Sequence, residues 1–284
     1  MNSEASLLSR LLKGFPVKII KEEFDITGLT QSEAIDGIVT TNSRDIILNF
    51  VHNNFNYLRQ HVYVFDLNRT LPTNWRPVPR NLFSENTFKG YQVSNLIFNV
   101  KYNLINVETG DKPELIFLLP VQVWVKNRKI IIKINTLERN ANDYFEDRVF
   151  LRSRDIDDDA IILGIKNSLP AGTTFVSCDL NRGIKSLLED DFIDLRYVKF
   201  KKSSSTATET MDEEFTLKNK YPDLYREIIA TPLEKTVVKL ITDAADTLIS
   251  HFNIEAGKGR MAFVKFPKTN DALPELIELI LSAN

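Results

Sequence analysis

The segment from Tyr91 to Leu137 limits what this chain can fold into more than any other part of the sequence. It holds three apolar runs, at 93–107, 115–125 and 129–134. They are separated by a turn at 109–113 that contains a glycine and a proline, and by the polar turn 126–128. Ile130, Ile132 and Ile134 alternate with other residues, as expected for a strand with one buried face. This pattern predicts an antiparallel meander.

Helices and strands are also predicted before the meander. Thr30 and Glu33 have the spacing of a capping box, which marks the start of a helix. Three prolines within 70–80 remove backbone donors and exclude regular structure there. Periodicity and capping signals predict helices over 4–13, 30–37 and 43–59, and strands over 17–26 and 61–67.

After the meander in the sequence, the acids Asp157, Asp158 and Asp159 precede an apolar run, which favours a helix over 160–165. A strand over 173–177, a helix over 180–188 and a strand over 194–202 follow. Residues 203–214 are rich in serine and threonine, so we place a mobile loop or subdomain border there. The chain then divides into an α/β region, 1–202, and a C-terminal region, 215–284, unless both form one continuous domain.

The C-terminal region is predicted to be mainly helical. Thr231 and Glu234 have capping-box spacing, with a proline at the first helical position. An apolar stripe from Leu233 to Phe252 then fits one helix of 20 residues. The fold class that follows is α+β, with a mostly antiparallel central sheet at about 91–137, flanking helices and a helical C-terminal portion.

The composition limits which classes of protein this chain can belong to. The 284 residues carry a net charge of −2 with a pI near 6.0, so the chain lacks the global positive field of a protein that coats nucleic acid. One cysteine cannot form an intramolecular disulfide, and no apolar run reaches the ~18 residues of a membrane span. We therefore expect a soluble, cytoplasmic protein that does not enter the membrane.

No catalytic motif is evident. The three histidines, His52, His61 and His251, do not have metal-ligand spacing, and no phosphate-binding glycine loop is present. Cys178 lies between a predicted strand and a helix, where a thiol pKa can fall, but no sequence signature pairs it with a base. The acids at 155–159 are explained by helix capping. We expect neither a metal nor a cofactor.

A metal nuclease of the restriction type would need an acid before one strand and a Glu-x-Lys pair on the next. Ile131 precedes Lys133 by two positions, and Gln122 is followed by Trp124, so this triplet is absent. The alternative function that remains open is a metal-dependent hydrolase whose site assembles from scattered carboxylates.

Local basic segments are the remaining signal. Basic residues beside aromatic and hydroxyl side chains can neutralise phosphates and stack on bases, although lysines also protect sheet edges. We therefore predict a non-catalytic binding protein or accessory subunit that engages a protein partner, with nucleic acid as a second candidate partner. The candidate contact residues are Trp124, Lys126, Arg128, Lys129 and Lys133 on one hairpin, and Arg196, Lys199, Lys201 and Lys202.

Overall fold

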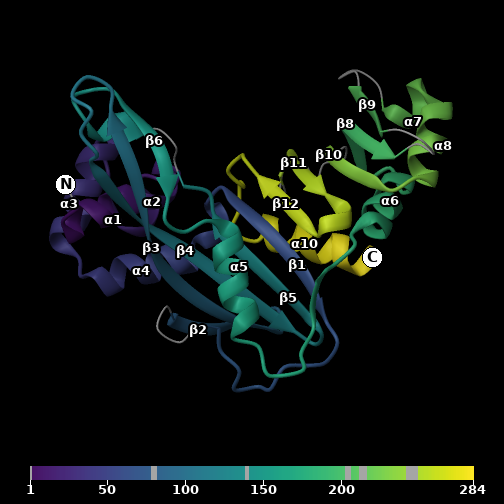
Figure 1. The fold of residues 1–284 in the computed structure, drawn as a ribbon, viewed down its shortest axis with the longest axis horizontal. Helices are drawn as coiled ribbons and strands as arrows, with labels where there is room; N and C mark the ends of the chain where they lie inside the picture. The colour runs from purple at the N-terminus through teal and green to yellow at the C-terminus, as the bar shows by residue number, and fades with distance from the viewer. Residues whose placement is uncertain (1, 78–81, 138–140, 202–205, 211–215, 241–248) are drawn as a thin grey trace. The chain divides into compact units, whose positions relative to one another are not determined.

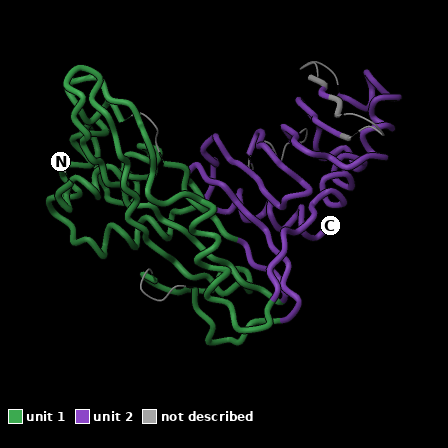
Figure 2. The backbone as a smooth tube through the Cα atoms, viewed as in Figure 1, with its two compact units in different colours: residues 1–58, 70–127, 132–173 green, residues 59–69, 128–131, 174–284 purple. Residues whose placement is uncertain are grey.

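A computed structural model describes residues 2–77, 82–137, 141–201, 206–210, 216–240 and 249–284. The chain forms two compact units (Figure 2). Unit 1 contains residues 1–58, 70–127 and 132–173, and unit 2 contains residues 59–69, 128–131 and 174–284. The chain thus crosses between the units several times. Residues 203–214, where a mobile loop or border was predicted, belong to unit 2, and residues 206–210 among them pair with residues 197–201.

The predicted meander forms the sheet of unit 1 (Figure 1). Its strands are β2 (Leu82–Phe88), β3 (Tyr91–Asn106), β4 (Glu114–Lys126) and β5 (Lys129–Asn135), in that order, and β5 begins with residues of unit 2. β3 pairs with β4 from Gln92 and Val125 to Asn103 and Glu114. The far end of β3 pairs with β6 (Val149–Arg154). The antiparallel meander is confirmed.

Helices pack an apolar core in unit 1. They are α1 (Glu4–Leu12), α2 (Val17–Glu23), α3 (Gln31–Thr41), α4 (Arg44–Asn53) and α5 (Asp158–Asn167), with short 3-10 turns at Phe55–Tyr57 and Ala141–Tyr144. The Thr30–Glu33 capping box is formed, and Asp157 caps α5. The strand predicted over 17–26 is wrong. Ile20 is buried in the core cluster of α1–α4, and Ile19 packs against the same cluster. One side of a helix can place both side chains in that core, so the segment is helical.

Unit 2 is built on a second antiparallel set of strands. They are β1 (Gln60–Leu67), β7 (Phe175–Ser177), β8 (Ile193–Lys201), β9 (Thr206–Thr210), β10 (Leu233–Leu240), β11 (His251–Glu255) and β12 (Arg260–Phe263). Their order is β1-β12-β11-β10-β8-β9, and β7 pairs with β1. A 3-10 turn, Ala256–Lys258, joins β11 to β12.

Two helices of unit 2, α6 (Asn181–Glu189) and α10 (Ala272–Ala283), pack against each other. A side chain at Gly183 would place its Cβ 2.3 Å from the carbonyl oxygen of Ile280, so only glycine permits this approach. Asn284 completes the contact, because its Oδ1 accepts from the Gly183 N–H at 3.0 Å and its Nδ2 donates to the Asp179 carbonyl at 2.8 Å. Two further helices are α7 (Leu217–Lys220) and α8 (Pro222–Ala230).

The helix predicted over 233–252 is wrong where the structure describes it, since 233–240 and 251–255 are strands. Thr236, Val238 and Leu240 are buried in alternation, and the β-branched run at 236–238 favours a strand. Residues 241–248 lie outside the described residues. Thr231 ends α8 instead of capping a new helix, and its hydroxyl donates to the Glu227 carbonyl at 2.9 Å. The terminal helix and the α+β class are confirmed.

None of the described helices is long and apolar enough to cross a membrane.

Candidate nucleic-acid interface

Two of the predicted contact residues, Trp124 and Lys133, are buried in unit 1. Trp124 is 2% exposed and Lys133 is 0% exposed, although both belong to the hairpin predicted to carry a surface patch. The Lys133 ammonium nitrogen lies 4.1 Å from the centre of the Trp124 ring. These side chains contact each other inside the fold, so neither presents a surface to a nucleic acid in this structure.

A polar network surrounds Lys133. Its Nζ donates to Asn56 Oδ1 and, at 3.5 Å, to Gln122 Oε1. Gln122 Oε1 also accepts from Trp124 Nε1 at 3.1 Å, and Gln122 Nε2 donates to Asn95 Oδ1 at 3.0 Å. Burial holds the pKa of Lys133 well below its ordinary value. This enclosed cluster fixes the hairpin in the core.

The other hairpin cations have nearby partners or are exposed. Lys126 donates to the Lys89 carbonyl at 3.2 Å and lies 4.7 Å from the centre of the Tyr91 ring. Arg128 is exposed. Lys129 in unit 2 is held by Asp66 Oδ1 at 2.7 Å and Cys178 Sγ at 3.3 Å. Burial lowers the pKa of Lys129, but its bonds to Asp66 and Cys178 outweigh burial and raise it.

Cys178 does not have the environment of a nucleophile. It is 2% exposed, and burial raises the pKa of its thiol, with a further rise from Asp66 that exceeds the opposing effect of Lys129. The position before α6 was expected to favour the thiolate. Burial and the neighbouring Asp66 carboxylate instead raise the pKa of the thiol, which disfavours the thiolate.

Among the acids at 155–159, Asp157 caps α5 and Asp158 and Asp159 lie in its first turn, whereas Asp155 bonds to β3. Asp157 Oδ1 accepts from the Ala160 N–H at 2.8 Å, and Asp155 Oδ1 accepts from the Lys101 N–H at 2.7 Å. Among the residues that the structure describes, no group of three or more histidine, cysteine or carboxylate side chains could hold a metal ion.

The sheet of unit 2 has one enclosed face, which the strand register identifies. One row of directly opposed residues crosses five strands and is 0 to 1% exposed throughout: Val62, Met261, Ile254, Thr236 and Val198. Phe252 and Phe263 stack on the same face, with ring centres 5.2 Å apart. Neighbouring residues on a strand point to opposite sides, so the flanking rows belong to the other face.

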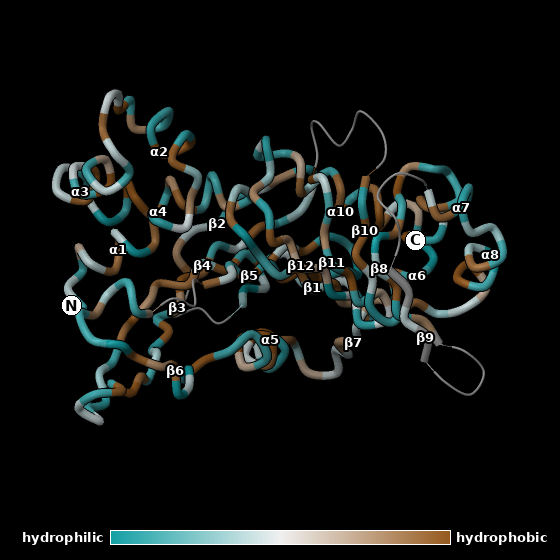
Figure 3. The backbone as a smooth tube through the Cα atoms, turned by 90° about the horizontal axis from the view of Figure 1, so that it is seen from above, coloured by the Kyte–Doolittle hydropathy of each residue, from teal (hydrophilic) through white to brown (hydrophobic). Residues whose placement is uncertain are grey.

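That other face, which we call the outer face, is partly open to solvent. Its central row is half-buried and consists of His61, Ala262, Asn253, Val237 and Tyr197. Figure 3 colours both hydrophilic and hydrophobic residues in the region of these strands. Two positions away on each strand, a second row contains Tyr63, Arg260, Glu255, Lys235 and Lys199. The third row contains His251, Lys239 and Asp194.

Cations dominate the outer face. Lys199, Lys235, Lys239 and Arg260 come from three different strands, and Arg196 lies beside Tyr197 on β8. Two acids offset part of this charge: Glu234 pairs with Lys199 at 3.3 Å and Glu255 pairs with Arg260 at 3.2 Å. The Asp194 carboxylate is bonded to the backbone, because its Oδ1 accepts a hydrogen bond from the Leu217 N–H. The positive charges therefore outnumber the negative ones.

Two titratable groups report this positive field. The pKa of His251 is lowered by burial and then by the charges of Lys265 and Arg196. Burial raises the pKa of Glu255, but the Lys258 hydrogen bond and the charges of Lys258, Arg260 and Lys235 lower it overall. The cations disfavour a positive charge on His251 and favour the negative charge of Glu255, as expected where cations gather.

Of the predicted contact residues, Lys199 lies on the outer face and the charge of Arg196 reaches it. The side chains of Lys201 and Lys202 lie outside the described residues. Sequence reasoning missed Lys235, Lys239 and Arg260. The first two were placed in the predicted helix of 233–252, which hid the alternation that puts them on one side of a strand.

No protein-family model matches this sequence, and no curated protein matches it.

Proposed function

We propose that this protein is a non-catalytic binding protein or accessory subunit that receives single-stranded nucleic acid on the outer face of unit 2. The supporting observation is that four cations from three strands share one sheet face with Tyr197, while the opposite face is enclosed. Spaced cations can follow a phosphate backbone, and a ring between them can stack on a base.

The dimensions of the outer face favour a single strand over a duplex. Neighbouring strands of a sheet lie roughly 4.8 Å apart, so the cations on β8, β10 and β12 are spread over three strand spacings, with β11 between β10 and β12. A sheet face gives unpaired bases a platform, whereas a duplex presents its bases only within grooves. Asn253, at the centre of the face, adds an amide that can bond to a base edge.

The test is fluorescence anisotropy of labelled single-stranded DNA and RNA with the full chain, from about 50 to 200 mM salt. Saturable binding that weakens steeply with salt is expected. The triple variant K235Q/K239Q/R260Q should reduce the salt slope by about 2, since each phosphate contact on a single strand contributes roughly 0.7.

The matched control neutralises three exposed cations of unit 1, in K18Q/K166Q/R44Q, which changes net charge equally. Equal losses in both triple variants would show that only net charge matters and would overturn the proposal. So would the absence of binding at the lowest salt concentration.

A further inference from the structure

Exposed apolar side chains cluster on two paired strands of unit 1. Ile105 and Val107, at and just beyond the end of β3, are 37% and 50% exposed, and Phe150 and Leu151 of β6 are 50% and 41% exposed. The described part of the chain holds eleven large apolar residues with this degree of exposure, and four of them lie here. Scattered apolar residues are normal on a surface, whereas a cluster indicates contact with a partner.

Three of these side chains share one face. Ile105 lies directly opposite Phe150, and the Val107 N–H donates to the Arg148 carbonyl at 3.0 Å. The Arg148 guanidinium lies 4.9 Å from the centre of the Phe150 ring. The patch therefore combines an apolar surface with a cation at its margin.

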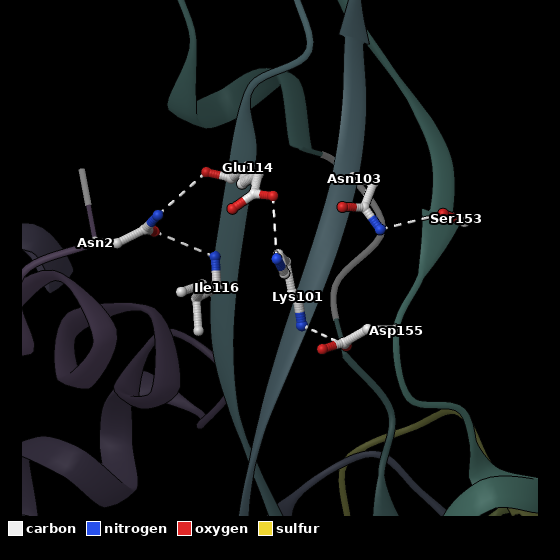
Figure 4. Close-up of polar contacts among 7 residues, drawn as sticks. All are labelled: Asn2, Lys101, Asn103, Glu114, Ile116, Ser153 and Asp155. Carbon is white, nitrogen blue, oxygen red and sulfur yellow. Dashed lines mark hydrogen bonds and ion pairs between the residues drawn. The ribbon is translucent and has the colours of Figure 1, made fainter.

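β6 also has an edge that no described strand pairs, since it pairs with β3 alone. Other edges of unit 1 are protected. At β4, the Asn2 side chain bonds to the backbone groups that a neighbouring strand would otherwise pair (Figure 4). Its Nδ2 donates to the Glu114 carbonyl and its Oδ1 accepts from the Ile116 N–H, both at 3.1 Å. The edge strand β2 exposes only polar side chains, at 85–87. Edges are commonly guarded in these two ways.

The charge around the β6 edge is positive. Arg152 and Arg154 are exposed, and no described carboxylate pairs with either of them. The neighbouring acids are engaged elsewhere: Asp147 accepts from Asn106 at 2.9 Å, and Asp155 accepts from the Lys101 N–H. An incoming acidic segment would therefore meet two guanidinium groups that form no ion pair with a described carboxylate.

The edge is held in place before any partner arrives. In Figure 4, Asn103 of β3 donates to the Ser153 hydroxyl of β6 at 3.2 Å, and Asp155 binds Lys101 just beyond the strand. At the other end, Asn142 Oδ1 accepts from the Val149 N–H at 2.7 Å and occupies that donor, so an added strand would pair with the edge beyond Val149. A pre-ordered edge lowers the entropy cost of adding a strand.

We infer that the outer edge of β6 is a docking site for an extended acidic segment of a partner protein, which joins the sheet of unit 1 as an added strand. Its backbone pairs with β6, its apolar side chains cover Ile105, Val107 and Phe150, and its carboxylates pair with Arg152 and Arg154. A second copy of this chain is a poor occupant, because pairing two β6 edges would bring arginines from both copies together.

The experiment measures anisotropy of a labelled short peptide of alternating glutamate and valine with the full chain. Saturable binding is expected, and R152E/R154E should weaken it by about tenfold or more. The control R182E/R226E reverses two exposed arginines of unit 2 and should leave binding unchanged. Circular dichroism checks that both variants fold.

A second peptide with every backbone nitrogen methylated keeps the same charge but cannot pair as a strand, so it should not bind. Equal binding of the two peptides would overturn the proposal in favour of simple charge attraction. It would also be overturned if the peptide failed to bind, if a lysine–valine peptide bound equally well, or if nucleic acid competed for the edge. Light scattering that shows a dimer lost in R152E/R154E would contradict it too.

Discussion

Basic residues on β-strands occur in both units, yet they have opposite surroundings. In unit 1, Lys133 lies against the Trp124 ring with no exposed surface, whereas in unit 2, Lys235 is exposed and the side chains of Lys199 and Arg260 remain 42% and 36% exposed. The local sequences look alike, since Lys133 and Lys235 each lie in a β-strand with several aliphatic residues. The comparison teaches that a basic residue on a strand can belong to a core network or to a surface, and only the covering of its face separates the two.

The largest difference should appear in stability. Lys133→Ala removes a buried side chain, deprives Asn56 Oδ1 of the Lys133 donor and leaves Gln122 Oε1 with Trp124 Nε1, so unit 1 should lose about 2 to 4 kcal/mol of unfolding free energy. Lys235→Ala on the outer face should change stability by less than about 0.5 kcal/mol. Urea unfolding followed by tryptophan fluorescence measures the first effect, because Trp75 and Trp124 both belong to unit 1. Equal losses of unfolding free energy in the two variants would contradict the difference between the two units.

The pH dependence of unit 1 should report His52, which is buried against Phe83. Burial lowers the pKa of His52 to about 3, while in the unfolded chain it is about 6.5. Between these values the unfolded chain binds a proton that the folded chain does not. Stability should therefore fall as pH falls through this window, by up to about 1.4 kcal/mol per pH unit.

Urea unfolding at several pH values, compared between the native chain and His52→Leu, isolates this contribution. The variant should show a shallower decline between pH 6 and 4, whereas His251→Leu in the half-buried outer face should alter the slope less. Parallel declines in the native chain and His52→Leu would show that His52 is not held neutral by burial.

The aromatic residues allow a sharper test. Tyr197→Ala should weaken nucleic-acid binding by about tenfold, which matches the loss of one stacked base, and Tyr197→Phe should keep most of the affinity. Trp124→Phe should lower stability without changing affinity, because Trp124 is enclosed in the network of unit 1. If Trp124→Phe weakened binding as much as Tyr197→Ala, the outer face would not be the binding surface.

The smallest effect concerns the ion pair between Lys199 and Glu234. Glu234→Gln removes an acid that competes with phosphate, so nucleic-acid binding should strengthen by about twofold. Stability should change by less than about 0.5 kcal/mol, because the pair is solvent-accessible. Anisotropy titrations at one fixed salt concentration measure this change, and weaker binding would argue against a phosphate near Lys199.

Much of the fold followed from local patterns. The turn at 126–128 and the capping box at Thr30 each depend on neighbouring residues, and the structure has both. The strand at 130–134 also forms, but it is buried on both faces rather than one, since Ile131 and Lys133 are as enclosed as Ile130, Ile132 and Ile134. The segments 17–26 and 233–252 failed for one reason. Their apolar spacing fits either a helix or a strand, and the choice depended on which core each segment met.

The candidate site was harder to predict than the fold. Arg196 and Lys199 were found because they form a basic run, while Lys239 stands singly among apolar residues and Arg260 follows a glycine-containing turn. They reach the same face only through the register of β8, β10, β11 and β12, which joins residues far apart in the sequence. No local signal carries that information.

The sequence by itself determined where strands and turns form in the meander, where several helices begin, and that the charges are nearly balanced, since these depend on adjacent residues or on totals. Only the tertiary structure decided which cations face water. A period of two shows that a strand has two sides, but which side is enclosed depends on the helices and strands that pack against it. Lys133 and Lys235 differ for that reason alone.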